Sequence, residues 1–369
     1  MKVLFVTNLP SPYRVDFFNE LGKLAELTVI YERSSASDRN KKWKSDKAVF
    51  YKEVFINARV LGTDRSLSFG VISEIKKCDF DYLILSGYSS PSVMLAIAYC
   101  RIKKIPYYIE SDGGFYKKDR FLLKLLKKFL LLKASGYFVS CEQFKTYLLS
   151  LGIDEAIIYK YNFTSLRFKD IISTPITDAE KLKIRQTLSL KEERIILTVG
   201  QFIERKGFDI LIKAAEKLSD NTGIYFVGGN PIDEYITLKE NLKLDNVHFV
   251  GFKSKEELKE YYKAADVFVL PTRKDIWGLV INEAMACGLP IITTDRCIAG
   301  LELVKNGNNG YIVPVDDVSE LAEKINQTLA DDDECKKMGQ NSISVIKDYT
   351  IENMALRHFE ILKELQTVE

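Results

Sequence analysis

Short apolar runs alternate with helical stretches along the whole chain. The runs in the first half are KVLFV, LTVIY, YLILSG, PYYIES and GYFVS, and those in the second half are RIILTVG, GIYFVGG, NVHFVG, DVFVLPT, LPIITTD and GYIVPV. Continuous stretches of Val, Ile, Leu and Tyr, separated by helices, are typical of parallel strands that are buried on both faces of a sheet. The pattern therefore predicts an α/β protein with two doubly wound units.

A polar segment separates the two sets of runs. Residues 166–180 are largely polar and contain Pro175, so we expect a linker there, between a first domain at 1–165 and a second domain at 181–347. The Asp and Thr of DYT, at the start of the segment 348–369, are a start signal for a last helix. Because this helix follows the second sheet, we expect it to pack back on the first domain.

The composition is that of an ordinary globular protein. The chain has 369 residues, of which 46% are hydrophobic and 28% charged, enough for two domains of normal size. No run approaches the roughly 20 apolar residues that a membrane span needs. The first residues, MKVLFVTNLPSPY, resemble a first strand more than a signal peptide, and the six cysteines have no metal-binding spacing. We therefore expect a cytoplasmic protein with reduced thiols.

Charge is distributed unevenly over the chain. Residues 1–165 contain 26 Lys and Arg against 17 Asp and Glu, whereas the remainder contains 27 against 34. The basic half either is an ordinary solvated surface or faces an anionic lipid or acceptor. In the segment Lys117–Lys128, five basic residues recur on one face of a predicted helix and leucines fill the other; these five are Lys117, Arg120, Lys124, Lys127 and Lys128. Either this helix packs its leucines into the core, or it lies in a membrane interface and makes the protein peripheral on the inner face of the membrane.

Two familiar motifs do not support a function here, because one lies at the wrong end of its strand and the other is absent. Asp79 and Asp81 resemble a metal-binding Asp-x-Asp pair, but they precede their strand, whereas ligands of open parallel sheets bind beyond the carboxyl ends of the strands. No GxGxxG follows the first strand, so an NAD-type oxidoreductase loses its main support.

The segment DIWGLVINEAMACG contains the clearest candidate chemistry. Asp275 lies on the loop after a strand, and Gly278 opens a helix whose unpaired amides are suited to a phosphate. Glycine allows the backbone to approach that phosphate closely. Glu283 lies one turn further along, and its two oxygens can accept hydrogen bonds from the vicinal hydroxyls of a ribose.

A second phosphate element is predicted at the first strand of this domain. In TVGQFIERKGFD the strand ends at Gly200, and Arg205 and Lys206 come directly before Gly207 at the start of a helix. Two adjacent cations at a helix start can neutralise a diphosphate, although either alone is more often a surface charge. Together with the helix start at Gly278 they predict a two-sided clamp.

These segments resemble the GT-B glycosyltransferases of family 4, the group 1 enzymes that transfer a sugar from a nucleotide donor with retention of configuration. The resemblance covers nearly the whole chain and is strongest from Ile195 to Val315. It implies two Rossmann-like domains that face a cleft. It also implies that Glu283 contacts the ribose, Asp275 the transferred sugar and Lys206 the diphosphate. The other implied donor contacts are the backbone of Gly278, Leu279 and Val280, the loop residues Gly200 and Gln201, and Phe252 and Lys253 beside the base.

The chain departs from the family pattern at three places. The first carboxylate of the motif is usually Glu, and Asp275 is one methylene shorter. Many members have Arg where this chain has Gln201, so Arg205 is our candidate for the missing charge. The glycine-rich loop that often follows the first strand is replaced here by NLPSPYR.

Candidates for acceptor binding come from the first domain. PYYIESDGGF ends a strand at the predicted cleft, where many family members have a His that this chain lacks. Glu110 and Asp112 are the polar candidates there, and Asp112 is equally explained as a turn residue. Arg14, at the start of a helix, either binds an acceptor phosphate or forms a structural ion pair.

We therefore expect a retaining glycosyltransferase that moves a sugar from a nucleotide-diphospho-sugar to a saccharide or lipid-linked acceptor in surface polysaccharide or glycoconjugate synthesis. Arg205, Lys206, Asp275 and Asp112 are the candidate catalytic residues. We expect no cofactor, no metal ion and no nucleic-acid partner. A nucleotide-sugar epimerase on the same fold and a non-catalytic donor-binding partner of another transferase remain open.

Overall fold

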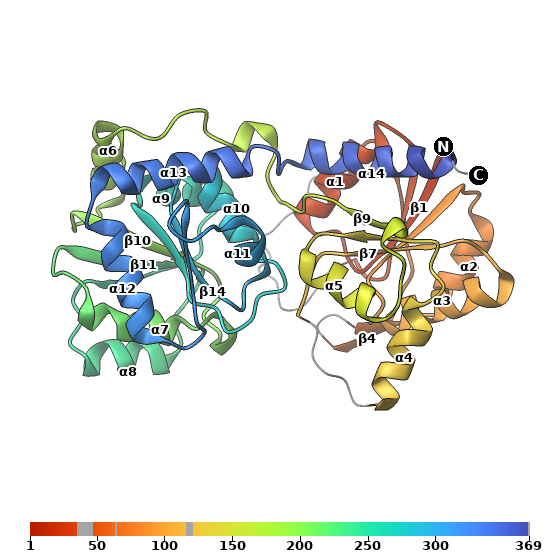
Figure 1. Cartoon of the computed structure of the whole chain (residues 1–369), viewed down its shortest axis with the longest axis horizontal. Coiled ribbons are helices and arrows are strands. Elements are labelled where there is room, and N and C mark those ends of the chain that lie inside the picture. Colours follow the sequence, from red (N-terminus) through yellow and green to blue (C-terminus); the bar gives the residue numbers. More distant parts are fainter. Residues whose placement is uncertain (35–46, 63–64, 116–120, 368–369) are drawn as a thin grey trace. The chain divides into compact units, whose positions relative to one another are not determined.

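The computed structural model describes residues 1–34, 47–62, 65–115 and 121–367 and divides the chain into two compact units (Figure 1). The first unit comprises Met1–Thr164 together with Thr350–Glu369, and the second comprises Ser165–Tyr349. Among the described residues, no helix is both long enough and apolar enough to cross a membrane.

The first unit is built on a parallel sheet of seven strands in the order β3-β2-β1-β6-β7-β8-β9. Its strands are β1 (Lys2–Thr7), β2 (Glu26–Tyr31), β3 (Lys52–Phe55), β6 (Tyr82–Ser86), β7 (Tyr108–Ser111), β8 (Gly136–Val139) and β9 (Ile158–Lys160), and β4 (Arg59–Gly62) and β5 (Arg65–Leu67) form a separate antiparallel pair. Its helices are α1 (Pro12–Gly22), α2 (Gly70–Lys77), α3 (Pro91–Lys103), α4 (Phe121–Leu131), α5 (Glu142–Ser150) and α14 (Ile351–Gln366). The chain order reverses direction across the sheet between β1 and β6.

The second unit has a parallel sheet of six strands in the order β12-β11-β10-β13-β14-β15. Its strands are β10 (Arg194–Val199), β11 (Thr222–Val227), β12 (Val247–Val250), β13 (Val267–Leu270), β14 (Ile291–Thr294) and β15 (Gly310–Val313). Its helices are α6 (Asp178–Leu188), α7 (Phe208–Ala214), α8 (Asp233–Asn241), α9 (Lys255–Ala264), α10 (Leu279–Ala286), α11 (Ile298–Leu303), α12 (Val318–Leu329) and α13 (Asp332–Ile346). Here the order reverses between β10 and β13.

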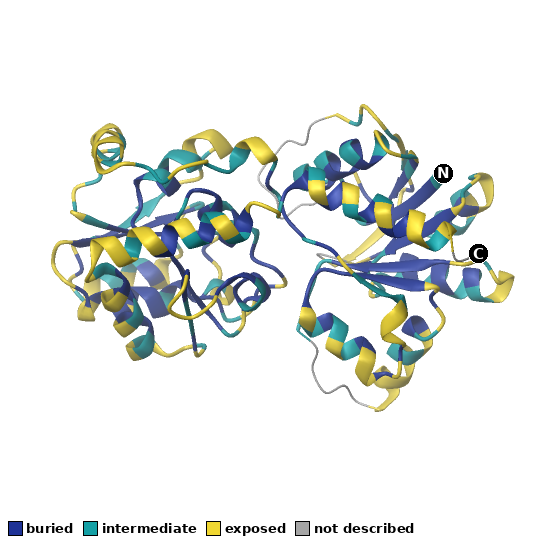
Figure 2. Ribbon diagram, turned by 45° about the horizontal axis from the view of Figure 1, so that its top comes forward, coloured by how far each residue is buried: buried dark blue, intermediate teal, exposed yellow. Residues whose placement is uncertain are grey.

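Both sheets confirm the predicted fold class. The central strands of both sheets are almost wholly buried, as in Figure 2, because helices cover both faces, whereas the edge strands β3, β9 and β12 are exposed or half-buried over much of their length. In the second unit the aromatic rings of Phe202, Phe208 and Phe226 pack against one another beneath α7. The last helix, α14, begins at the capping residue Thr350 and packs against α1 in the first unit, as predicted.

The predicted linker is different in the structure. Residues 166–180 belong to the second unit, and several contacts fasten this segment to that unit's helices. The amide of Ile172 donates to the carbonyl of Ala286 at 3.0 Å, and Asp170 pairs with Lys255 on α9 at 2.8 Å. Polarity marked this segment as an irregular connection but did not reveal that its backbone is paired.

The amphipathic segment near residue 120 forms α4, and its apolar face is exposed. Phe121 and Leu122 are 74% and 78% exposed, whereas Leu130 and Leu131 are buried. The interpretation in which the leucine face packs into the core is therefore wrong for most of the helix. Lys117 and Arg120, which were assigned to the same helix, lie outside the described residues.

Candidate active site

The two predicted phosphate elements of the second unit meet at the point where its sheet order reverses. The loop after β10 carries Arg205 and Lys206 in a short 3-10 helix (Glu204–Lys206), and the loop after β13 carries Asp275. Because β10 and β13 are parallel neighbours, both loops lie at the carboxyl edge of the sheet. In open α/β sheets, ligands bind in the crevice at such a switch point.

Backbone contacts fix the two loops against each other. The carbonyl of Arg205 accepts hydrogen bonds from the amide of Arg273 and from the hydroxyl of Thr272, both at 2.9 Å. Gly207 has a φ of +64°, and a Cβ there would collide with the carbonyl oxygen of Pro271. Arg273 also binds Asp209 through two nitrogens at 2.8 and 2.7 Å. The position of the cations is therefore set by the loop that carries the carboxylate.

Lys206 and Asp275 form the centre of the site. The Nζ of Lys206 lies 2.6 Å from an Oδ of Asp275. The side chain of Lys206 is 11% exposed and that of Asp275 is 13% exposed. A guanidinium nitrogen of Arg205 lies 3.5 Å from the other carboxylate oxygen, and this side chain is 44% exposed. One carboxylate thus faces two cations, and the cluster has a net positive charge that suits an anionic ligand.

The start of α10 completes this side of the site. Asp275 is held in place by backbone pairing with the loop after β14, since its amide donates to the carbonyl of Arg296 at 2.8 Å. Gly278 caps the helix with a φ of +102°, and a Cβ there would lie 2.7 Å from the sulfur of Cys297. Only glycine fits this close approach without strain. Leu279 and Val280, the first residues of α10, are partly exposed, as an anion-binding helix start requires.

Glu283 lies further along α10 and contacts a different partner. One of its oxygens accepts a hydrogen bond from the hydroxyl of Tyr262 on α9 at 2.9 Å. Burial raises the pKa of Glu283, and the hydrogen bond from Tyr262 opposes that rise. Sequence reasoning did not identify Tyr262, which fixes the direction of the carboxylate.

The remaining predicted donor residues lie on neighbouring loops of the same edge. Gln201 follows Gly200 directly after β10 and is exposed. Phe252 is 39% exposed on the loop after β12, and Lys253 beside it lies 3.7 Å from Glu257. An exposed aromatic ring beside a cation is a surface on which a nucleotide base can stack.

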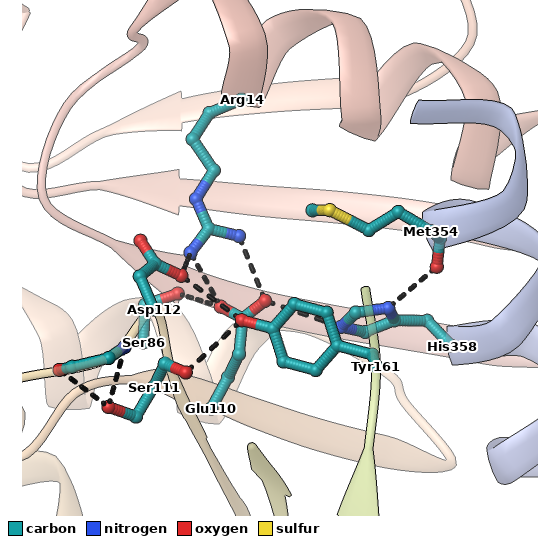
Figure 3. A network of polar contacts seen from close by, with 9 residues as sticks. Arg14, Ser86, Glu110, Ser111, Asp112, Tyr161, Met354 and His358 are labelled. Carbon is teal, nitrogen blue, oxygen red and sulfur yellow. Dashed lines mark hydrogen bonds and ion pairs between the residues drawn. The ribbon is translucent and has the colours of Figure 1, made fainter. Parts of the chain in front are cut away.

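A buried polar network occupies the corresponding position in the first unit (Figure 3). Arg14, on α1, donates two parallel hydrogen bonds of 2.9 Å to the two carboxylate oxygens of Glu110 at the end of β7. The hydroxyl of Ser86, at the end of β6, donates to Glu110 at 2.8 Å. Arg14 also pairs with Asp112, which accepts a hydrogen bond of 3.2 Å from the hydroxyl of Tyr161.

This network corrects the predicted roles of Arg14 and Glu110. Arg14 is 3% exposed and Glu110 is completely buried, so they bind each other instead of an acceptor. The structural ion pair, one of the two interpretations of Arg14, is the arrangement found. Asp112 differs from both, because its side chain is 29% exposed at the rim of the network.

His358 is the member that sequence reasoning missed. It reaches the network from α14, where its Nδ1 pairs with the carbonyl of Met354 at 2.8 Å and its Nε2 lies 3.3 Å from Glu110 (Figure 3). Its ring is fully buried and stacks on Phe138, with the ring centres 5.0 Å apart. The sequence offered one signal, a histidine on the last helix in a chain with only two.

The two carboxylates of the network have pKa values shifted in opposite directions. Burial alone would raise the pKa of Glu110, but Arg14 and His358 outweigh burial and lower it to about 2. Burial raises the pKa of Asp112, and the attraction of Arg14 only partly offsets that rise.

A pH dependence of stability follows from Glu110. Its folded pKa of about 2 lies below its ordinary value of 4.5, so its contribution to stability is fully present above pH 4.5 and is lost as the pH falls towards 2. The difference in urea midpoint between wild type and Glu110→Gln should therefore be large at neutral pH and shrink below pH 4.5. A difference that stays constant down to pH 3 would contradict this assignment.

Comparison with known proteins finds a family match in the second unit. Residues 180–345 match the family described as glycosyl transferases group 1. The N,N'-diacetylbacillosaminyl-diphospho-undecaprenol α-1,3-N-acetylgalactosaminyltransferase of Campylobacter jejuni is 23% identical over 356 residues, which make up 94% of this chain and 88% of that protein. Mannosylfructose-phosphate synthase of Agrobacterium fabrum is 36% identical over 133 residues, 32% of this chain and 29% of that protein.

Solved structures share the fold of the whole chain. Sucrose-phosphate synthase of Thermosynechococcus elongatus has a TM-score of 0.79 at 19% identity, and the comparison covers 100% of both chains. HepE of Anabaena, solved in complex with UDP and glucose, has a TM-score of 0.74 at 17% identity over 98% of this chain and 99% of that one. The chain thus has the GT-B fold, and its residues 180–345 match the group 1 glycosyl transferases.

Proposed function

We propose that this protein is a retaining glycosyltransferase that uses a nucleotide-diphospho-sugar as donor and a saccharide or lipid-linked molecule as acceptor. The observation that carries the proposal is the cluster of Lys206, Arg205 and Asp275 beside the start of α10, at the switch point of the second unit. Two cations and a helix N-terminus can all face one diphosphate. The Anabaena structure with UDP and glucose, which has the same fold, supports this type of donor.

The cluster suggests how the donor is bound and activated. In the structure Asp275 neutralises Lys206, so an incoming diphosphate replaces one anion with another at little electrostatic cost. Lys206 and Arg205 then hold the phosphates, and Asp275 is released towards a hydroxyl of the sugar. When the bond between the sugar and the diphosphate breaks, the cations and the amides at Leu279 and Val280 stabilise the charge on the leaving group. These groups supply the positive charge, so the proposal calls for no metal ion.

Retention requires that the acceptor hydroxyl attack the face of the sugar from which the diphosphate leaves. We assign the acceptor to the first unit, where Asp112 is the partly exposed carboxylate of the network. Arg14 and Tyr161 hold this carboxylate, and Gly113 and Gly114 follow it with positive φ angles. Asp112 is therefore our candidate for orienting the acceptor hydroxyl. The relative from Campylobacter jejuni, whose name includes a diphospho-undecaprenol, supports a lipid-linked acceptor.

Glu283 is assigned to the ribose of the donor. Replacing it with alanine should weaken donor binding by about 10- to 150-fold, because a hydrogen bond to a charged group contributes about 1.5 to 3 kcal/mol. Tyr262→Phe is the matched control: it removes the hydroxyl that orients Glu283 but leaves the carboxylate, so a smaller loss is expected. Isothermal titration calorimetry measures both. Equal donor affinity in Glu283→Ala and wild type would contradict the assignment.

A product assay tests the reaction itself. The protein is incubated with a panel of nucleotide-sugars, with and without saccharide or lipid-linked acceptors, and the products are followed by NMR. The proposal predicts a glycosidic bond with the same anomeric configuration as the donor, formed only when acceptor is present. A changed sugar without acceptor would indicate an epimerase, and donor binding without any product would indicate a non-catalytic donor-binding protein.

A further inference from the structure

Arg273 lies on the loop after β13, and its guanidinium binds three other residues of the second unit. Its two terminal nitrogens donate to the two carboxylate oxygens of Asp209, in the first turn of α7, at 2.8 and 2.7 Å. One of these nitrogens also donates to the carbonyl of Glu204 at 2.9 Å, and Nε donates to Asp316, just after β15, at 2.7 Å. One side chain therefore ties together the loops that follow β10, β13 and β15.

Two of these contacts lie on either side of Lys206. Glu204 precedes Lys206 by two residues, and Asp209 follows it by three. Between them, Gly207 turns the chain with a φ of +64° and lies directly against the carbonyl of Pro271. Because the guanidinium holds the chain before and after this turn, it determines where the side chain of Lys206 leaves the backbone.

The guanidinium is committed to these internal contacts. Four of its five N–H groups donate to Glu204, Asp209 and Asp316, and the side chain is 26% exposed. The two carboxylates neutralise its charge, so it adds little to the positive charge that attracts an anionic ligand. Arg273 can therefore act on a reaction only through the residues that it holds in place.

Asp316 has an unusual backbone conformation. Its φ is +63°, in a region that residues other than glycine rarely adopt. In this conformation its carboxylate pairs with Nε of Arg273, while its side chain remains 52% exposed. Residues in sparsely populated conformations persist where surrounding contacts fix them, and they gather at functional sites. The contact indicates that Asp316 sets the orientation of the guanidinium.

We propose that Arg273 is a positioning residue for the diphosphate clamp: it fixes the turn that carries Arg205 and Lys206, and Asp316 orients its guanidinium. The inference rests on the proposed function, because Lys206 is assigned there to the leaving diphosphate. Misplacing a catalytic group by about 1 Å can lower a rate by about 100-fold. Arg273 thus controls turnover without contacting the donor.

A double-mutant cycle on kcat tests whether Arg273 acts through Lys206. Arg273→Ala should lower kcat by about 100-fold, because the turn loses its fixed position. Arg273→Ala combined with Lys206→Ala should be no slower than Lys206→Ala alone, within about threefold, because positioning has no effect once the positioned group is gone. Independent contributions would multiply instead and make the double variant about 100-fold slower than Lys206→Ala.

Arg185→Ala is the matched control for a purely structural role. Arg185, on α6, donates to the carbonyls of Ala264 and Glu193 at 2.8 Å and to Asp266 at 2.7 Å. Asp266 comes directly before β13, so these contacts lie at the opposite edge of the same sheet. Arg185→Ala should therefore lower the urea midpoint of the second unit but leave kcat within a few-fold of wild type.

Arg273→Lys is a second variant in case Arg273→Ala does not fold. It keeps the charge and the apolar stem, but an ammonium group lacks the planar fork that binds Asp209 through two nitrogens. Its kcat should therefore lie between those of Arg273→Ala and Arg185→Ala.

Calorimetric titration with a nucleoside diphosphate and its monophosphate gives a readout besides activity. Wild type should prefer the diphosphate by about tenfold or more, and Arg273→Ala should lose this preference while Arg185→Ala keeps it. A preference that Arg273→Ala keeps, a multiplicative double-mutant cycle, or an equal loss of kcat in Arg185→Ala would each overturn this inference alone. A wild-type protein without the preference would overturn the proposed donor site, and this inference with it.

Discussion

Replacing Lys206 with alanine is expected to lower the rate of sugar transfer by about 100- to 1,000-fold, the usual effect of removing one donor that stabilises a developing negative charge. Lys206 is the cation closest to Asp275. Its side chain is 11% exposed, against 44% for Arg205, so Lys206 is better shielded from water. Its contribution to a leaving diphosphate is therefore weakly screened. Steady-state kinetics with the donor and acceptor that the product assay identifies measures the effect on kcat.

Lys213→Ala is the matched control for this change. Lys213 lies on the next helix, α7, is exposed and pairs loosely with Asp209 at 3.6 Å, so its removal should leave kcat within a few-fold of wild type. Circular dichroism of both variants should show an unchanged fold. If Lys206→Ala retains wild-type turnover, the diphosphate is bound elsewhere.

Replacing Arg14 with alanine is expected to destabilise the first unit by about 3 to 5 kcal/mol, because it leaves the buried carboxylate of Glu110 without its main partner. Arg14 makes a bidentate contact with Glu110 and also pairs with Asp112, so one substitution disrupts both pairs. Urea unfolding, followed through the transition of the first unit, measures the loss.

The control is an exposed ion pair in the same unit. Lys2 and Asp79 are 2.6 Å apart, but their side chains are 42% and 84% exposed, so Lys2→Ala should leave the urea midpoint of the first unit close to that of wild type. An Arg14→Ala protein that unfolds within 1 kcal/mol of wild type would mean that the network contributes little to stability.

The sheets could be predicted from the sequence because buried parallel strands leave a local signal. Each run of Val, Ile and Leu is a strand, and the α/β alternation follows directly. The edge strands β3 and β9 of the first sheet are exposed or half-buried and have no such run, so the pattern did not predict them. The hydrophobic pattern also failed to predict two other features of the structure. The segment from 166 to 180 is polar yet paired by its backbone to α10, and the leucines of α4 are apolar yet exposed. Hydrophobic patterning shows which residues avoid water on average, but it does not show what covers them.

The two parts of the candidate site also differed in how far the sequence could predict them. In the second unit, Asp275, Gly278 and Glu283 lie within nine residues of one another, so their spacing could be interpreted from the sequence alone. In the first unit, Glu110 meets Arg14 from 96 residues away and His358 from 248 residues away. No local spacing connects these positions. Only the fold brings α14 beside β7 and shows that Arg14 is committed to an internal ion pair.

The most direct test of a donor clamp at Lys206 is a calorimetric titration of the full chain with matched nucleoside mono- and diphosphates. Because the cations and the start of α10 are assigned to a diphosphate, one nucleoside diphosphate should bind about tenfold more tightly or better than its monophosphate. This difference should disappear in Lys206→Ala and persist in Lys213→Ala. Equal binding of the two nucleotides to wild type, or a preference that survives in Lys206→Ala, would contradict the account.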